Sequence, residues 1–282
     1  SRNNEMRTGV QNASDSAAAT EAVNEETQTE TRSPLEFVTP TDFVTLPSKG
    51  QGYPTNHPLH NQEILEIKFM TAKEEDILTS RALLKKNLAI ERFLQSIIKD
   101  KRIDPKHMLI GDRNAVIIAA RSSGYGEIYE TNVACPACAE RATVEFDLSN
   151  PTIHESTIPE IGDVQMTSNG TYLLTTPVSN FRVELKLMTG EDENYVSQIM
   201  MSNKKHKMPE TNMSEQYKRM IVSVEGHSDR RVINHFLQNA PARDMRFIRT
   251  VYKSISPDVK VLNDFNCQSC GHEQELEVPF GA

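Results

Sequence analysis

The amino-acid sequence predicts an α+β protein of two related helical units, each ending in a β-hairpin with a Cys-x-x-Cys turn at its tip. Three observations support this fold class. Segments with apolar residues at helical spacing are interspersed with segments in which apolar and polar residues alternate. Two Cys-x-x-Cys motifs, at residues 135–138 and 267–270, each lie between two alternating segments. Residues 184–189 (ELKLMT) repeat residues 66–71 (EIKFMT) nearly residue for residue.

The first 60 residues are predicted to lie outside these units. Residues 1–33 are mostly Ala, Ser, Thr, Asn and Glu, with almost no large apolar side chain. Burial cannot offset the ordering entropy of such a segment, so we expect an N-terminal extension that is flexible or ordered by a partner. Residues 34–60 are interrupted by Pro40, Pro47 and Pro54. Proline disfavours helix in the residue before it, so this stretch is predicted to be an extended arm with tight turns.

The first unit is assigned to residues 61–150 and begins with a strand. Residues 64–70 alternate between apolar and polar side chains, as expected of a strand with one buried face. Thr71, followed by Glu74, has the spacing of a capping box, in which each side chain bonds the backbone N–H of the other residue. This motif predicts a helix that runs to about Lys86.

Three further helices are predicted before the first Cys motif. One, at about 88–99, has one apolar face formed by Ile90, Phe93, Leu94, Ile97 and Ile98. Asp104 and Pro105 have the residue types of an N-cap and a first-turn proline, which predicts a short helix. Asp112 is expected to cap another helix, whose apolar run 115–120 should be buried and which should end at residues 122–124.

The apolar period changes to two around both Cys motifs. The alternating segments are residues 129–133 and 142–148 around the first motif, and residues 259–265 and 276–280 around the second. Two alternating segments joined by a short polar turn predict a β-hairpin. Each Cys motif is therefore expected at the tip of a hairpin.

The second unit, residues 151–282, repeats the plan of the first. Thr189 and Asp192 again open a helix, and further helices are predicted at about 214–225, 229–239 and 242–255. Asp244 aligns with Asp112, and from there the offset between the units is constant at 132 residues, against 118 before it. We therefore predict an internal duplication with an insertion in the second copy; the alternative is a coincidence of common elements.

The four cysteines, Cys135, Cys138, Cys267 and Cys270, are the candidate metal ligands. Two thiolates separated by two residues can chelate one ion, and four complete a tetrahedral site. An ion shared by the motifs would tie the hairpins together, and metal binding contributes on the order of 10 kcal/mol of folding free energy in small zinc domains. Four thiolates leave no open coordination position, which favours structure over catalysis. Zinc is the default ion, and a four-cysteine iron–sulfur cluster is the competitor.

Composition and compartment agree with a structural metal. The chain has 282 residues, enough for a sizeable core, and 31 basic against 39 acidic side chains give a net charge of −8. An acidic chain argues against a broad nucleic-acid-binding surface. No apolar run approaches the roughly 18 residues of a membrane helix, and the first residues lack the apolar core of a signal peptide. We therefore expect a cytosolic-type compartment, where thiols stay reduced, and no membrane partner.

Other functions have weaker support. The Gly271-His272-Glu273 turn resembles the knuckles of zinc ribbons in transcription and translation proteins, so a nucleic-acid-binding or regulatory module is the alternative. Acidic residues surround the motifs, however, and argue against phosphate binding. His272 is expected to act in the turn or beside the ligands rather than as a ligand. No group of residues has the pattern of a catalytic site, so neither enzyme activity nor a small-molecule substrate is expected.

Longer motifs resemble a known family. They are residues 46–54 (LPSKGQGYP), 70–79 (MTAKEEDILT), 111–115 (GDRNA) and 123–126 (SGYG), together with the two Cys motifs. From about residue 35 onward the chain resembles the baseplate hub subunit or hub-assembly family of contractile-tailed, T-even-like bacteriophages. The resemblance implies a virion or assembly component of the tail baseplate, made in the host cytoplasm, whose partners are other baseplate and tail proteins. It leaves open whether the protein remains in the mature virion.

Overall fold

The computed structural model describes residues 39–206, 208 and 212–278. The predicted extension 1–33 lies outside the described residues. From Thr39 onward the chain forms one compact unit. Among the described residues, no helix combines the length and the apolar character that crossing a membrane requires.

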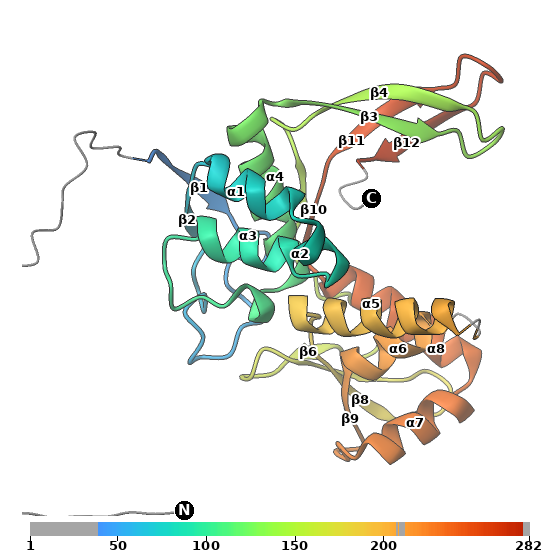
Figure 1. Cartoon of the computed structure of the whole chain (residues 1–282). Helices are drawn as coiled ribbons and strands as arrows, with labels where there is room; N and C mark the ends of the chain where they lie inside the picture. The colour runs from blue at the N-terminus through green and yellow to red at the C-terminus, as the bar shows by residue number, and fades with distance from the viewer. Residues whose placement is uncertain (1–38, 207, 209–211, 279–282) are drawn as a thin grey trace, which may run out of the picture. The chain divides into compact units, whose positions relative to one another are not determined.

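The first half of this unit contains two hairpins with helices between them (Figure 1). Its elements are β1 (Thr41–Thr45), β2 (Ile64–Lys68), α1 (Ala72–Thr79), α2 (Arg81–Lys85), α3 (Ala89–Ile97), the 3-10 helix η1 (Pro105–His107), α4 (Ile110–Tyr125), β3 (Ile128–Ala134) and β4 (Arg141–Asp147). β1 pairs with β2, and β3 pairs with β4, both antiparallel.

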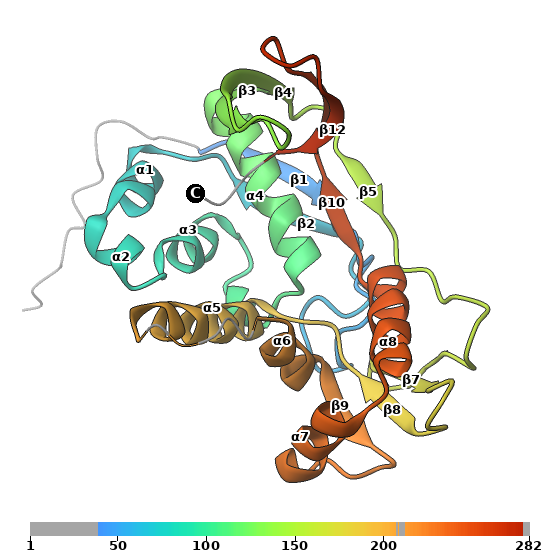
Figure 2. The same ribbon diagram turned by 90° about the vertical axis from the view of Figure 1, so that its right-hand side faces the viewer.

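The second half has a similar order of elements with additional strands (Figure 2). Its elements are β5 (Thr152–His154), β6 (Gln165–Met166), β7 (Tyr172–Thr175), β8 (Arg182–Leu185), α5 (Gly190–Lys205), α6 (Asn212–Met220), β9 (Ile221–Val224), α7 (Arg230–Asn239), α8 (Ala242–Ile255), β10 (Asp258–Lys260), β11 (Leu262–Asn266) and β12 (Glu273–Glu277). Its sheets are β6-β7-β8-β9 and the hairpin β11–β12, while β10 pairs with β5. The mixture of helices with small antiparallel hairpins confirms the predicted fold class at this level.

Several local predictions are confirmed. Both capping boxes are present, Thr71 with Glu74 before α1 and Thr189 with Asp192 before α5. The side chain of Asp104 accepts a hydrogen bond from Lys106 N at the start of η1. The helices predicted at 229–239 and 242–255 are α7 and α8. In each case the signal lies within one turn of the helix, which is why sequence alone could reveal it.

A buried aspartate holds one helix of each half against the turn of a hairpin, α4 against the turn between β1 and β2 and α8 against the turn between β7 and β8. Oδ1 and Oδ2 of Asp112 in α4 accept hydrogen bonds from the backbone N (3.0 Å) and Oγ (2.6 Å) of Ser48, and Tyr53 donates a third bond (2.7 Å). In α8, Asp244 accepts from Ser179 N (3.0 Å) and Oγ (2.7 Å), and from Val178 N (2.8 Å). The two halves therefore share this anchor.

The prediction that Asp112 caps α4 was wrong. The helix begins at Ile110, and Leu109 stands at the N-cap, so Asp112 lies inside the first turn. Its carboxylate is fully buried and bonds the turn after β1, while burial raises its pKa. The predicted end at 122–124 was also too early, because α4 continues to Tyr125 and ends at Gly126, whose φ of 91° lies in the left-handed region.

Three predicted helices differ from the structure. The helix predicted at 214–225 stops at Met220, because residues 221–224 instead form β9 and pair with β8. The helix predicted to reach Lys86 is divided at Ser80, whose ψ of 107° leaves the helical region. In α3, Ile90 of the predicted apolar face is 38% exposed, whereas Phe93, Leu94 and Ile97 are buried.

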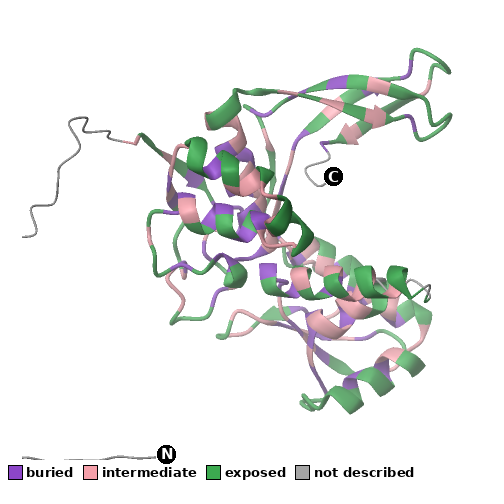
Figure 3. Cartoon of the chain, in the orientation of Figure 1, coloured by how far each residue is buried: buried purple, intermediate pink, exposed green. Residues whose placement is uncertain are grey.

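The segment predicted to be an extended arm contributes to the core. Leu46, Tyr53 and Leu59 are all buried, and β1 lies in a sheet with β2. Figure 3 shows buried residues on the inner faces of the helices and on these strands. The turn after β1 is therefore part of the compact unit, because its apolar side chains complete the packing against α4.

The two halves meet through backbone contacts at the start of α4 and α5. Ile110 N donates to Met188 O (3.2 Å), and Gly190 N donates to Met108 O (3.0 Å). Gly111 lies so close to the carbonyl of Pro257 that an added Cβ would stand 2.1 Å from that oxygen. A glycine is therefore required where α4 crosses the chain that leads into β10.

Loss of either buried aspartate should destabilise the protein. Asp112→Ala leaves buried donors unpaired and should lower the free energy of unfolding by about 3 kcal/mol. Asp244→Ala leaves unpaired only part-buried donors, which water can reach, and should lower it by about 1 kcal/mol. Urea titrations followed by circular dichroism would measure the change. Asp76→Ala, which removes an exposed carboxylate from α1, is the matched control and should shift stability by less than about 0.5 kcal/mol. Equal stability of all three variants would contradict the anchor.

Candidate metal centre

The two Cys-x-x-Cys turns close their hairpins with the same backbone hydrogen bonds. In the first, Cys135 N donates to Glu140 O (2.8 Å), and Ala139 N donates to Cys135 O (2.8 Å). In the second, Cys267 N donates to His272 O (2.9 Å), and Gly271 N donates to Cys267 O (2.8 Å). These are equivalent positions, so both turns present their two sulfurs in the same way.

Each turn places the residue after its second cysteine in the left-handed region. Ala139 has a φ of 60° and Gly271 a φ of 71°. Glycine adopts this conformation without strain, whereas alanine adopts it at a cost of about 1 kcal/mol. The first turn therefore keeps the tight geometry despite an unfavourable residue.

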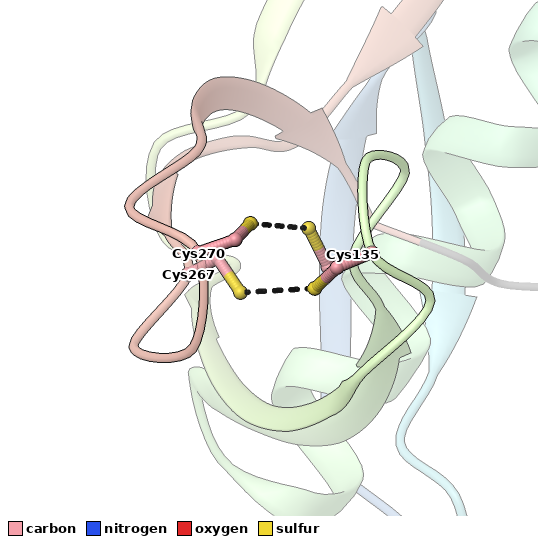
Figure 4. A group of neighbouring side chains, drawn as sticks. Cys135, Cys267 and Cys270 are labelled. Atoms are coloured by element: carbon pink, nitrogen blue, oxygen red, sulfur yellow. Dashed lines mark hydrogen bonds between the residues drawn. The ribbon is translucent and has the colours of Figure 1, made fainter.

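The four predicted residues meet between the hairpin tips. The Sγ atoms of Cys135 and Cys270 are 3.8 Å apart, and those of Cys138 and Cys267 are 3.7 Å apart (Figure 4). All four sulfurs lie within 4.8 Å of one another. In each turn the first cysteine is buried and the second is exposed. The group could hold a metal ion.

Packing brings the two hairpins side by side. Asn263 Nδ2 in β11 donates a hydrogen bond to Glu145 O in β4 (2.6 Å). Val144 and Phe146 of β4 and Phe265 of β11 are buried. The alternation predicted from the sequence therefore places the apolar side chains inward, and this apolar contact positions both turns before any ligand is considered.

Backbone donors and neighbouring sulfurs act in opposite directions on the thiols. The N–H groups of Cys270 and Ser269 lower the pKa of Cys267 to about 6. At Cys138 the Glu140 N–H also lowers the pKa, but the sulfur of Cys270 and burial outweigh it, and the pKa is raised to about 12. The pKa shifts favour the thiolate at Cys267 and disfavour it at Cys138, so a positive charge between the sulfurs would be needed to ionise both.

His272 points to a neighbour in its own hairpin. Its Nε2 lies 3.2 Å from Gln274 Oε1, and its backbone oxygen accepts the bond from Cys267 described above. This agrees with the predicted role in the turn. Sequence reasoning missed the left-handed Ala139, because a non-glycine residue gives no signal of that conformation.

A centre with four protein thiolates has no open coordination position, which is typical of structural proteins rather than catalysts. Comparison with known families is consistent with this class: residues 40–281 match the family described as T4 bacteriophage base plate protein. The chain therefore belongs to this family. No curated protein and no solved structure matches it. Membership indicates a non-enzymatic, structural role in the baseplate of the virion tail and interaction with other phage tail proteins.

The turn geometry can be tested by exchanging its left-handed residues. Gly271→Ala should lower the free energy of unfolding by about 1 kcal/mol through backbone strain alone, because the added Cβ meets no described atom within 4 Å. Ala139→Gly should change stability in the opposite direction. Thermal unfolding at fixed zinc concentration would measure both, and a shift of the same sign in the two variants would contradict the shared geometry.

Proposed function

We propose that the protein is a structural or assembly component of the hub or wedge–hub region of the baseplate, held rigid by one zinc ion on Cys135, Cys138, Cys267 and Cys270. The spacing of the four sulfurs is the observation that supports the zinc ion. Four thiolates about 2.3 Å from a zinc ion lie about 3.8 Å apart at the corners of a tetrahedron. The two cross-hairpin distances of 3.8 and 3.7 Å agree with this value.

The same spacing favours a single ion over an iron–sulfur cluster. In a cluster the four cysteines are divided between at least two iron atoms, so sulfurs on different irons are farther apart than the ligands of one ion. Four sulfurs within 4.8 Å leave little room for several irons and bridging sulfides. Zinc is favoured because it takes four thiolates in a tetrahedron and has no redox chemistry.

The ion would act as a clip between the two halves. It would join a turn of residues 61–150 to a turn of residues 151–282, the two units assigned from the sequence. The hairpins already touch through Asn263 and Glu145. An ion at the tips adds a second attachment about one hairpin length away, and two attachments prevent the hairpins from separating or sliding.

An internal duplication explains why the clip is symmetric. The two Cys turns have the same backbone hydrogen bonds. Both α4 and α8 carry a buried aspartate that bonds a serine. The hairpins β1–β2 and β7–β8 close with equivalent bonds, from Leu46 N to Glu63 O (2.8 Å) and from Thr176 N to Phe181 O (2.9 Å). The aspartate–serine bonds join residues 64 and 65 positions apart, and such long-range bonds do not recur by chance as readily as helices do. These parallels support one ancestral unit.

The alternative, a zinc-ribbon-like nucleic-acid-binding module, is disfavoured by charge. Residues 127–148 contain five acidic and one basic side chain, and so do residues 258–278, so the hairpin segments together carry −8, equal to the net charge of the chain. Phosphate recognition needs cations at the binding surface. Proteins of the baseplate are therefore better candidates for partners than nucleic acid.

Removing two ligands should release the ion and weaken assembly. In Cys135→Ser/Cys138→Ser the remaining pair cannot complete a tetrahedron. We expect wild-type protein to contain one zinc per chain by elemental analysis with no visible absorption, and the variant to contain none and to melt at least about 5 °C lower. Ser269→Ala, an exposed change in the same motif, is the control. A variant without metal but with unchanged melting would refute the clip.

Incorporation into tails tests the function itself. A phage that lacks the gene, supplied with the wild-type chain, should form complete baseplates, whereas the double serine variant should reduce the yield of plaque-forming particles by about tenfold or more. Immunodetection in purified tails shows whether the chain stays in the virion or acts only during assembly. Complete baseplates in the absence of the chain would contradict the proposal, and salt-sensitive DNA binding would favour the alternative.

A further inference from the structure

β1 has an open edge within the described part of the chain. It pairs there with β2 alone, and the second edge of β2 is closed by a bridge between Ile67 and Ile98. Leu46 N donates to Glu63 O (2.8 Å) just after β1. Because residues of an antiparallel pair alternate in facing the partner strand, the backbone N–H of the preceding Thr45 is directed away from β2.

A groove of about 460 Å³ lies along this edge. β1 contributes residues 42–45 to one wall, and the rest of the lining includes Ala115, Ala119 and Ser122 of α4 and Pro151 and Ile153 of the segment that contains β5. Small side chains of α4 leave the space open. The charged residues in the lining are Asp42 and Glu127, both acidic.

The second half shows what fills the equivalent place. β7 corresponds to β1, since Thr176 N donates to Phe181 O (2.9 Å) as Leu46 does to Glu63. The N–H of the preceding Thr175 points away from β8 and donates to Gly162 O (3.2 Å). Beside this bond, β6 pairs antiparallel with the same edge of β7. Gly162 also lies against the ring of Phe247 in α8. An extended segment therefore fills the space between the strand edge and the long helix.

The side chains of the two helices differ in this space. Three residues after the buried aspartate, α8 has Phe247 where α4 has Ala115, and one turn later α8 has Val251 where α4 has Ala119. In the second half the larger Phe247 packs against Gly162 of the segment that covers the edge of β7. In the first half the smaller residues leave room for side chains that an incoming strand would bring.

We infer that the β1 groove binds an extended segment of another baseplate protein, which adds to the β1–β2 sheet as an antiparallel third strand. The segment would carry apolar side chains at alternate positions, to fill the space above Ala119, and at least one Lys or Arg, to face Asp42 and Glu127. A second copy paired through its own β1 would bring two Asp42 carboxylates together, so the charge of the groove favours a different, basic chain. The inference rests on the proposed function for the partner's identity alone.

A matched pair of proline variants tests the open edge. Proline removes a backbone N–H and is tolerated where that N–H has no partner. Thr45→Pro should melt within about 2 °C of wild type and yet reduce incorporation into baseplates by about tenfold or more, because it removes a donor of the added strand. Thr175→Pro should lower the melting temperature, because its N–H is already bonded to Gly162. Equal destabilisation by both variants would overturn the inference.

A second variant leaves the backbone of β1 intact. Ala119→Phe places a bulky side chain in the groove from the side of α4 and should reduce incorporation to a similar extent with normal melting. Wild-type incorporation of both Thr45→Pro and Ala119→Phe would overturn the inference. Failure of the wild-type chain to support the formation of complete baseplates would contradict the proposed function without bearing on the groove, which the amide hydrogen exchange described next tests on its own.

Amide hydrogen exchange tests the groove without a baseplate. In the free, full-length protein the Thr45 amide should exchange fast; slow exchange would mean that the chain itself covers the edge and would overturn the inference. Addition of a synthetic peptide of alternating valine and lysine should slow this exchange about tenfold or more in wild type and not in Ala119→Phe. Absence of protection in wild type would likewise count against an added strand.

Discussion

The buried aspartate at the start of each long helix is the interaction on which the remaining architecture depends. Asp112 binds the turn between β1 and β2, and Asp244 binds the turn between β7 and β8, and so each sets the distance between a strand edge and a helix. α4 then leads into β3, and α8 leads through β10 into β11. The placement of both hairpins, and with them of the four sulfurs, follows from where these two helices are held.

Much of the fold and the cysteine cluster could be predicted, because their signals are local. The pair Thr71 and Glu74 encodes a helix start within four residues, and alternation on both sides of each Cys motif encodes a hairpin. The errors concern long-range partners. Asp112 has the residue type of a cap, but its acceptor oxygens serve Ser48, 64 positions earlier. Residues 221–224 continue a helical apolar pattern, but they pair with the edge of β8 and form the strand β9.

The two halves combine a common framework with different surfaces. The framework of hairpin, helices and Cys turn recurs, while the second half covers the edge of its first strand with its own chain and the first half has a groove there. A duplication of the kind proposed above would permit this division, because one copy can maintain the fold while the other acquires contacts. The hairpin segments of both halves are acidic, and this charge distinguishes them from the neutral remainder of the chain. A baseplate subunit needs such distinct faces, since each neighbour must find only its own site.

The position of the Cys motifs also has a mechanical consequence. Residues 139–266 lie between the two motifs, so an ion shared by the four sulfurs would place almost the entire second half inside a closed loop of chain. Tension applied at residues 39 and 278 would then pass through the clip rather than through that loop. Under such a load, half of the fold would carry no tension until a metal–sulfur bond breaks.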